Sequence, residues 1–302
     1  MVQAHRIKTV AIAGCTAVGK SETALKLARR FNGVLIGADS MQIYRGFDIG
    51  TGKLTKSECG EIEHKMIDIA DGDAYFSVGE YVELAKKEIE SAAARGKLPI
   101  IVGGTGLYIT SLLSGCNFAD APKDENLRKT LKILSHFFGI TVMHGLLEFI
   151  DKPSAEKISA NDSKRVIRAL EIYALRGEAK STVAEYKKPY DDLTVVLTLP
   201  RELLYDRINR RVRKMFDDGL ICEAEGLMKY KECGSMQALG YKQIAAMQGS
   251  PREVIEEVTA QKTRNYAKRQ ITYFKNMKLN KVFIDARDYS AVENCIRQFV
   301  EK

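Results

Sequence analysis

Short apolar runs alternate with amphipathic segments through the first 118 residues. The apolar runs cover residues 9–13, 34–37 and 99–102, and their length is typical of buried strands; the more polar segment 64–69 is expected to be another short strand. The segments between them include one helical repeat that follows the first run and another that ends near Ala94. Ser77 and Glu80 precede the second repeat with the spacing of a capping box. Strands and helices that alternate in this way predict an α/β fold, in which a parallel sheet carries helices on both faces.

The pattern changes near residue 119. Residues 120–190 contain helix-forming segments and no convincing strand, and Asn161 or Asp162 is expected to cap a helix over 163–176 that ends before Gly177. Strand character returns at 193–199, helical periodicity extends from 201 to about 279, and a last strand covers 281–284. We therefore predict a core formed by residues 1–119 and 191–302, with a helical insertion domain over 120–190.

The composition changes this picture little. With 45% hydrophobic and 28% charged residues, the chain has the make-up of an ordinary globular protein, and its net charge of +8 is compatible with an acidic partner. The six cysteines form no C-x-x-C pair and the four histidines show no zinc-ligand spacing, which predicts reduced thiols in a cytoplasmic protein. We find no signal peptide and no apolar stretch of membrane-spanning length, so no membrane partner is expected.

The strongest local signal is a glycine loop between the first apolar run and the first helix. It has the form G-x-x-x-x-G-K-S of a phosphate-binding P-loop, as in nucleotide-binding and ATP-binding proteins, and consists of Gly14, Cys15, Thr16, Ala17, Val18, Gly19, Lys20 and Ser21. Backbone N–H groups and the helix N-terminus are expected to hold phosphate groups. Lys20 would contact phosphate oxygens, and Ser21 would ligate Mg²⁺. The loop therefore predicts a ligand that carries a phosphate or a diphosphate.

Two further segments follow apolar strands and are expected at the same edge of the sheet. Asp39 comes just after the run 34–37, which we expect to neighbour the P-loop strand, so its carboxylate should lie near the phosphates. It could act as a general base or as a Mg²⁺ ligand, or it could cap a turn with Ser40. Residues 103–106 (Gly-Gly-Thr-Gly) offer the hydroxyl of Thr105, although a tight strand-to-helix turn explains these glycines equally well.

Basic residues gather in two regions. Residues 201–214 contain five arginines and one lysine, and the segment between Glu257 and Asp285 has seven basic residues and no acid. Tyr266, Tyr273 and Phe274 interleave with the second group. Basic side chains with aromatic residues available for stacking indicate binding of single-stranded RNA, and the alternative is a solvated helix face with core aromatics.

Taken together, these motifs resemble the tRNA dimethylallyltransferases, the isopentenyl-tRNA transferase family, in their bacterial form. The resemblance runs nearly from end to end. Beside the P-loop, it rests on the segments 38–45, 64–68, 103–108, 161–171, 240–242 and 263–270. Two positions depart from the family pattern, because proline is usual where Cys15 stands and tryptophan is common where Tyr273 stands.

The resemblance implies a P-loop NTPase-like fold and the transfer of dimethylallyl from its diphosphate to the exocyclic amine of the adenosine 3′-adjacent to the tRNA anticodon. It implies Asp39 as the general base, Lys20 and Arg211 on the diphosphate, Thr105 in the catalytic site and Mg²⁺ as cofactor. The implied enzyme is a cytoplasmic monomer that binds the anticodon stem-loop. The implied tRNA-binding residues are Asp39, Ser40, Met41, Gln42, Thr105, Arg128, Lys164, Arg165, Val166, Ile167, Arg168, Gly240, Tyr241, Lys242, Lys268 and Arg269.

Two alternatives from other classes use the same P-loop. A small-molecule kinase gives no reason for a basic, acid-free segment near the C-terminus. An RNA-binding nucleotide switch would bind ATP or GTP and would need no buried base beside Thr105.

Overall fold

The computed structural model describes residues 6–115, 124–179 and 188–302. Its contacts divide the chain into two compact units. The first, which we call the α/β unit, consists of Met1–Ser114 and Lys188–Lys302, and the second, the helical unit, is Gly115–Lys187. The boundary expected at 119/120 lies outside the described residues.

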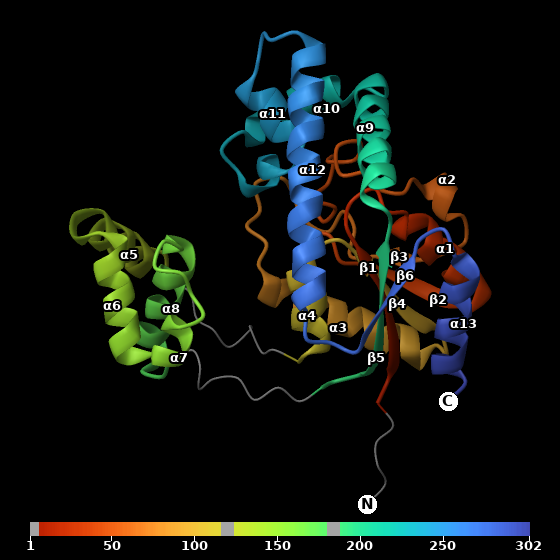
Figure 1. Cartoon of the computed structure of the whole chain (residues 1–302), viewed down its shortest axis with the longest axis horizontal. Helices are drawn as coiled ribbons and strands as arrows, with labels where there is room; N and C mark the ends of the chain where they lie inside the picture. Colours follow the sequence, from red (N-terminus) through yellow and green to blue (C-terminus); the bar gives the residue numbers. More distant parts are fainter. Residues whose placement is uncertain (1–5, 116–123, 180–187) are drawn as a thin grey trace, which may run out of the picture. The chain divides into compact units, whose positions relative to one another are not determined.

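A six-stranded parallel sheet forms the centre of the α/β unit, in the order β3-β2-β4-β1-β5-β6 (Figure 1). This confirms the P-loop-type parallel sheet predicted from the alternation of strands and helices. β3 is shorter than the predicted run, because Met66 and Asp68 adopt positive φ angles of 64° and 54° directly after it. The strands are β1 (Lys8–Gly14), β2 (Gly33–Gly37), β3 (His64–Lys65), β4 (Leu98–Gly103), β5 (Asp191–Thr198) and β6 (Lys281–Asp285).

The expected neighbourhood of β2 and β1 is wrong, because β4 lies between them. Ile100 of β4 is in register with Val10 of β1 on one side and with Leu35 of β2 on the other. The crossover from β1 to β2 skips one position in the sheet, and β4, which is apolar toward both faces, fills it. Asp39 therefore lies two strands away from the P-loop rather than one.

Helices cover both faces of the sheet. On one face, α1 (Lys20–Arg30) and α13 (Tyr289–Val300) pack on Val10, Ile12 and Leu35. On the other, α3 (Val78–Ala94), α4 (Gly106–Leu113) and the end of α12 (Arg252–Asn276) pack on Ile36 and Ile101. The predicted capping box at Ser77 and Glu80 is present at α3. The helical pattern of α13 is not among the elements predicted from the sequence.

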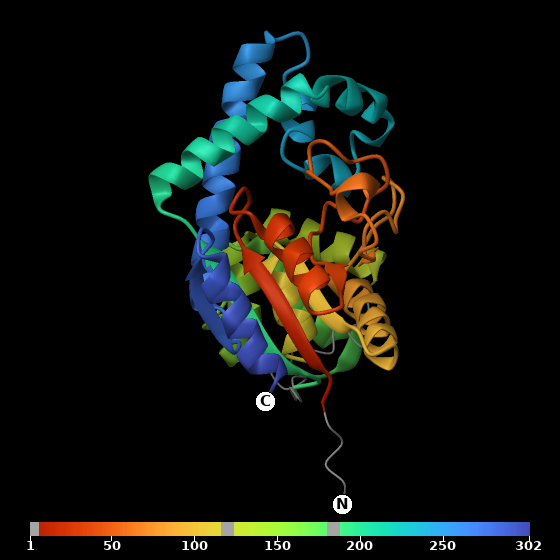
Figure 2. The same cartoon turned by 90° about the vertical axis from the view of Figure 1, so that its right-hand side faces the viewer.

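Two long helices, α9 (Arg201–Asp217) and α12, extend beyond the carboxyl edge of the sheet (Figure 2). They contact each other, and α10 (Leu220–Gly226) and α11 (Tyr241–Ala246) connect them. The segment 45–60, expected to be loop, also contains a short helix, α2 (Lys56–Cys59), which Thr55 and Glu58 close with a capping box. This arrangement places parts of α9 and α12 beside the ends of the strands.

The helical unit has a core of its own. Its helices are α5 (Glu125–Phe138), α6 (Ile140–Ile150), α7 (Lys152–Ala155) and α8 (Ser163–Arg176). Of the two expected caps, Asp162 is the residue that accepts a hydrogen bond from the N–H of Arg165, and Gly177 ends α8. Leu131, Met143 and Leu147 are buried against α8 side chains in one cluster.

Among the described residues, no single helix is long and apolar enough to cross a membrane; α5 and α6 reach the required length and hydropathy only together, and a bend of 118° separates them. The five described cysteines are free thiols, as expected, and Cys116 lies outside the described residues.

Candidate active site

The P-loop lies between β1 and α1, as its sequence predicts. Gly14 has a φ of 146°, and a Cβ atom there would stand 2.8 Å from the carbonyl oxygen of Leu197, so only glycine fits. Ala17 and Gly19 also have positive φ angles, of 63° and 107°, which curl the backbone into a concave turn. Cys15, where the family usually has proline, is buried within this turn.

Two cations, Lys20 and Arg211, line the pocket beside the loop. The ammonium of Lys20 donates a hydrogen bond to the carbonyl of Cys15 at 2.8 Å, and burial lowers the pKa of Lys20 to about 8. Burial also lowers the pKa of Arg211, a shift that the carboxylate of Asp39 opposes. Two poorly hydrated cations close to one carboxylate form a site that favours a multiply charged anion.

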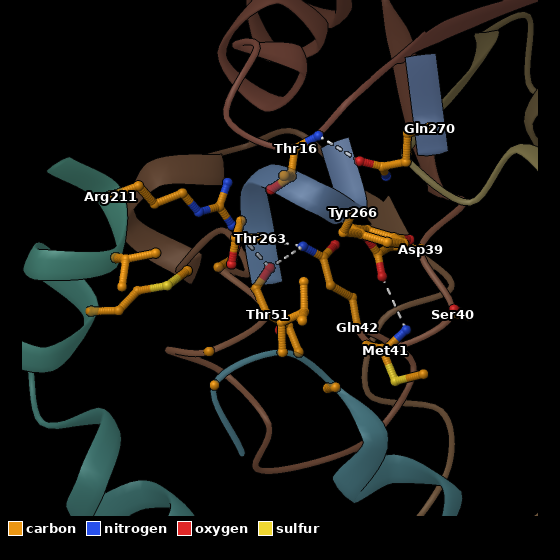
Figure 3. Close-up of a pocket in the computed structure, with 18 of the residues that line it drawn as sticks. Thr16, Asp39, Ser40, Met41, Gln42, Thr51, Arg211, Thr263, Tyr266 and Gln270 are labelled. Atoms are coloured by element: carbon orange, nitrogen blue, oxygen red, sulfur yellow. Dashed lines mark hydrogen bonds between the residues drawn. The ribbon is translucent and has the colours of Figure 1, made fainter. Parts of the chain in front are cut away.

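Arg211 reaches the site from α9. Its Nη2 donates to the carbonyl of Thr51 at 3.2 Å, and a Cβ on Gly52 would fall 2.1 Å from the same nitrogen. The amide of Gln42 donates to the carbonyls of Thr51 and Gly52 at 3.1 and 3.3 Å. The loop at 51–52 is therefore held from both sides, and the guanidinium extends from α9 toward the centre of the pocket (Figure 3).

Asp39 occupies a rigid turn at the end of β2. Its Oδ1 accepts a hydrogen bond from the N–H of Met41 at 3.0 Å. The hydroxyl of Thr105 accepts from the N–H of Ser40 at 2.9 Å and donates to the Ser40 hydroxyl at 3.3 Å. The turn-capping role considered for Asp39 is thus present, and the carboxylate also lines the pocket.

The pocket between these groups has a volume of about 260 Å³. It is lined by the P-loop, by the ends of the strands and by α9 and α12 (Figure 3). The structure brings Thr16, Lys20, Ser21, Asp39, Ser40, Met41, Gln42, Arg211, Gly240 and Arg269, all predicted site residues, to this one pocket. Reasoning from the sequence did not place Thr51, His64, Thr263, Tyr266 and Gln270 there.

Gln270 connects α12 with both glycine loops. Its Oε1 accepts a hydrogen bond from the P-loop N–H of Thr16, and its Nε2 donates to the carbonyl of Gly104, each at 2.9 Å. A Cβ on Gly104 would stand 2.5 Å from Nε2, so the close approach requires glycine. Gln270 belongs to the segment 263–270 of the family resemblance, and that membership was the only signal in the sequence for this role.

Two other side chains shape the pocket wall. Tyr266 lies beside Asp39 in Figure 3, and burial raises the pKa of its hydroxyl to about 12, a shift that the carboxylate of Asp39 increases. Burial lowers the pKa of His64 to about 4, and neither of its ring nitrogens has a hydrogen-bond partner among the residues that the structure describes. Both rings are therefore neutral at physiological pH.

Not every predicted RNA-binding residue is accessible. Tyr241 is fully buried, where its hydroxyl donates to Glu223 and accepts from the N–H of Gly50. Val166 and Ile167 lie in the core of the helical unit, so their side chains are not available to RNA. In each case, burial of the apolar part of the side chain stabilises the residue's own unit and removes that surface from contact with RNA.

Two of the three predicted arginines of the helical unit, Arg128 and Arg168, form an internal charge cluster with Glu171. Glu171 is fully buried and accepts hydrogen bonds from Arg128 at 2.8 Å and from Arg168 at 2.7 Å. Burial would raise the pKa of Glu171, but the hydrogen bonds from these two arginines outweigh it and lower the pKa. Lys164 and Arg165, by contrast, are exposed at the start of α8.

In the basic segment between Glu257 and Asp285, some side chains make hydrogen bonds within the protein and others are exposed. Lys281 donates to the carbonyls of Phe274 and Lys275 and so caps the end of α12, and Arg264 bonds to Asn209 of α9. Lys268 and Arg269 are exposed, like Lys242 on α11. The Arg269 guanidinium lies 5.5 Å from the centre of the Tyr266 ring.

Tyr273, where tryptophan is common in the family, packs on α4. A Cβ on Gly106 would stand 2.2 Å from its ring, and its hydroxyl bonds to Thr110 at 3.2 Å. Tyr273, Thr110 and Arg269 also line a second pocket, which lies beside α12.

The described residues contain no cluster of three or more histidine, cysteine or acidic side chains that could hold a metal ion alone. The hydroxyl of Ser21 and the carboxylate of Asp39 do line the same pocket. Such a sparse oxygen donor set fits Mg²⁺, which keeps several waters and is usually bound together with substrate phosphates.

The chain is similar to several known proteins. The IPP transferase family model matches residues 42–277. The tRNA dimethylallyltransferases of Bacillus cereus and Bacillus anthracis are 43% and 44% identical to this chain over 304 residues, which cover 98% of it and 96% of each relative. The solved structure of a full-length tRNA isopentenylpyrophosphate transferase from Bacillus halodurans is 40% identical, covers 97% of both chains and has a TM-score of 0.72. A eukaryotic dimethylallyltransferase acting on tRNA is 30% identical, with a TM-score of 0.86 over 98% of this chain and 80% of its own.

Proposed function

This chain belongs to the IPP transferase family, and from that membership we propose that it transfers a dimethylallyl group from dimethylallyl diphosphate to tRNA. The acceptor is the exocyclic amine of the adenosine 3′-adjacent to the anticodon, and diphosphate is released. The observation that carries the proposal is the pocket in which a P-loop, two cations and one carboxylate converge, in a chain 43% identical over its length to a tRNA dimethylallyltransferase.

The donor's diphosphate would occupy the P-loop. P-loop backbone N–H groups other than that of Thr16, which bonds to Gln270, would contact the leaving group together with the side chains of Lys20 and Arg211. As the allylic C–O bond breaks, its electron pair remains on the diphosphate, and these donors stabilise the additional charge. The low pKa of Lys20 and the burial of Arg211 support this role, because a desolvated cation interacts more strongly with an anion.

Asp39 would act as the general base. The adenine amine attacks the allylic carbon, the new C–N bond forms as the C–O bond breaks, and the amine transfers a proton to the carboxylate. The hydrogen bond from Met41 and the contacts of Thr105 with Ser40 fix the turn that carries Asp39. We assign Thr105 to positioning, because both of its hydroxyl contacts are to Ser40.

Mg²⁺ would be held by Ser21 together with the donor's phosphate oxygens, where it supplies further positive charge to the leaving group. The residues that line the pocket all come from the α/β unit. Because the acceptor is tRNA, we propose that the reaction takes place in the cytoplasm.

The anticodon stem-loop would lie along the exposed cations. Lys268 and Arg269 on α12 and Lys242 on α11 belong to the α/β unit, and Lys164 and Arg165 belong to the helical unit. A flexible loop can unstack the target adenosine at low free-energy cost and place its amine in the pocket.

A labelling experiment tests the proposal. Purified enzyme is incubated with radiolabelled dimethylallyl diphosphate and Mg²⁺, with or without tRNA, and in parallel with labelled ATP. We expect label to enter tRNA from dimethylallyl diphosphate alone, without ATP, and not to enter a transcript in which uridine replaces the target adenosine. Transfer of phosphate from ATP to a small molecule, or turnover that requires ATP, would instead favour a kinase or a nucleotide switch.

A further inference from the structure

The loop over residues 48–52, which we call the nest loop, is held by a carboxylate from α10. Three consecutive backbone N–H groups, those of Asp48, Ile49 and Gly50, donate hydrogen bonds to the side chain of Glu223. Its Oε1 accepts from Ile49 at 3.0 Å and from Gly50 at 3.3 Å. Its Oε2 accepts from Ile49 at 3.0 Å and from Asp48 at 3.3 Å. One side chain therefore satisfies three successive backbone donors.

This arrangement requires an anion and a glycine. Successive N–H groups that converge in this way form an anion-binding concavity, in which a carboxylate accepts more strongly than a neutral side chain. The hydroxyl of Tyr241 on α11 connects the two partners, because it donates to Glu223 and accepts from the N–H of Gly50 at 3.1 Å. A Cβ on Gly50 would stand 2.4 Å from the Tyr241 ring, so only glycine allows this approach. One hydrogen-bond network thus joins the nest loop to α10 and α11.

The other end of the nest loop holds Arg211. The carbonyl of Thr51 accepts a hydrogen bond from Nη2 of Arg211 at 3.2 Å, and it is the only acceptor of that guanidinium among the residues that the structure describes. The hydroxyl of Thr51 donates to the carbonyl of Phe47 at 2.6 Å, which closes the loop on itself. In Figure 3, Thr51 lies between Arg211 and Gln42, whose amide donates to the same carbonyl. The direction of the guanidinium therefore depends on where the loop places one carbonyl.

We propose that Glu223 is a positioning residue of the donor site, which acts through the nest loop to hold Arg211 toward the diphosphate. Of the described residues, Gly50, Thr51 and Gly52 line the pocket and Glu223 does not, so its effect on the donor passes through the loop. A guanidinium that is already in place needs no reorganisation when the leaving group gains charge. This inference rests on the proposed function, in which Arg211 contacts the diphosphate.

Glu223→Gln tests the proposal. Glutamine keeps the size of the side chain and one acceptor oxygen, but its amide nitrogen cannot accept the remaining N–H groups. Calorimetry with inorganic pyrophosphate and Mg²⁺ measures the anion site without prenyl transfer. We expect pyrophosphate affinity and the single-turnover rate at saturating donor each to fall about tenfold, with tRNA affinity unchanged. The control is Glu225→Gln, an exposed position on the same helix, which should match wild type.

A double-mutant cycle with Arg211 separates positioning from a general effect on the fold. If Glu223 acts through Arg211, adding Glu223→Gln to Arg211→Ala should lower the transfer rate by less than about twofold beyond Arg211→Ala alone. Losses that multiply in the double variant would overturn the proposal, and so would wild-type kinetics in Glu223→Gln. Melting curves of all variants show whether each one is folded.

Tyr241→Phe provides a second test, which decides the question if Glu223→Gln does not fold. It removes the hydroxyl between Glu223 and Gly50 and keeps the buried ring. We expect a loss of about threefold in pyrophosphate affinity and in transfer, which disappears in the Arg211→Ala background. No loss, or a loss that persists in that background, would contradict the proposal. Failure of the proposed function looks different, because the wild-type chain would then bind pyrophosphate without transferring a prenyl group to tRNA.

Discussion

At the scale of single residues, Lys20 should make donor binding depend on pH. Its pKa of about 8 means that the ammonium is charged below pH 8 and loses its proton as the pH rises beyond that value. We expect the affinity for dimethylallyl diphosphate to be constant up to about pH 7 and to fall roughly tenfold by pH 9. Titration calorimetry at several pH values measures this. Lys20→Arg, whose guanidinium keeps its charge, should bind more weakly overall but without the decline.

Asp39 can be tested without disturbing its turn. Asp39→Asn retains an oxygen that can accept the hydrogen bond from the N–H of Met41 but cannot accept a proton. We expect kcat to fall by about 100-fold or more, with tRNA affinity nearly unchanged. Single-turnover kinetics and a filter-binding assay separate the two quantities. Activity within a few-fold of wild type would show that another group takes the proton.

The sequence predicts best those residues whose role follows from their spacing to neighbouring residues in the chain. The P-loop from Gly14 to Ser21 is recognisable because strand, glycines and helix are contiguous. Thr51, His64 and Gln270 reach the pocket through tertiary contacts that no local pattern records. The burial of Tyr241 has no local signal either, because a tyrosine beside a lysine has the same sequence signature in a core as on an RNA-binding surface.

At the scale of elements, α12 supports both glycine loops through Gln270. Gln270→Ala removes the hydrogen bonds to Thr16 and Gly104, so the P-loop should lose its support from α12. We expect donor affinity to fall about tenfold, equivalent to about 1.4 kcal/mol, with the melting temperature lowered by a few degrees. The control is Thr272→Ala on the same helix, whose hydroxyl bonds only within α12. Equal losses in both variants would assign the effect to helix stability.

The exposed cations of α12 should set the salt dependence of tRNA binding. Replacing Lys268 and Arg269 together by alanine should weaken binding and flatten the plot of log affinity against log salt, by about 0.7 per lost phosphate contact. Any change in donor affinity should come from Arg269, which lines the pocket, and not from Lys268. Lys281→Ala is the control. Lys281 caps the end of α12, so this substitution should lower the melting temperature without altering the slope. An unchanged slope in the double variant would show that the RNA phosphates contact another surface.

Periodicity predicted the existence of most elements but not their order in space. Nothing in the runs 34–37 and 99–102 says which of them pairs with β1, because both are short and apolar on both faces. The crossovers decide the order, and the result, with β4 beside β1, emerges only from packing the whole sheet. β3 is shorter than the predicted strand because Met66 and Asp68 adopt positive φ angles, and the pattern of hydrophobic and polar residues does not predict such angles.

At the scale of the molecule, donor binding should depend on the α/β unit alone, whereas tRNA binding should depend on both units. The α/β unit has its own cores and contains every residue of the pocket, and the helical unit has a core of its own. Replacing residues 116–187 by a short glycine–serine linker should therefore leave a folded protein that binds dimethylallyl diphosphate with nearly wild-type affinity. Affinity for tRNA should fall by at least tenfold, because Lys164 and Arg165 are lost. Calorimetry with each ligand and a thermal melt check this, and loss of donor binding would show that the units depend on each other.

The central position of β1 also has a consequence for synthesis on the ribosome. β1 is the first strand to emerge, yet β5, which pairs with its full length from Lys8 to Gly14, is encoded about 180 residues later. At translation rates of about 5–20 residues per second, one edge of this apolar strand stays unpaired for roughly ten to forty seconds. The helical unit, whose residues all precede β5 in the chain, can fold during that interval. The nascent α/β unit is therefore open to aggregation or to chaperone binding until β5 arrives.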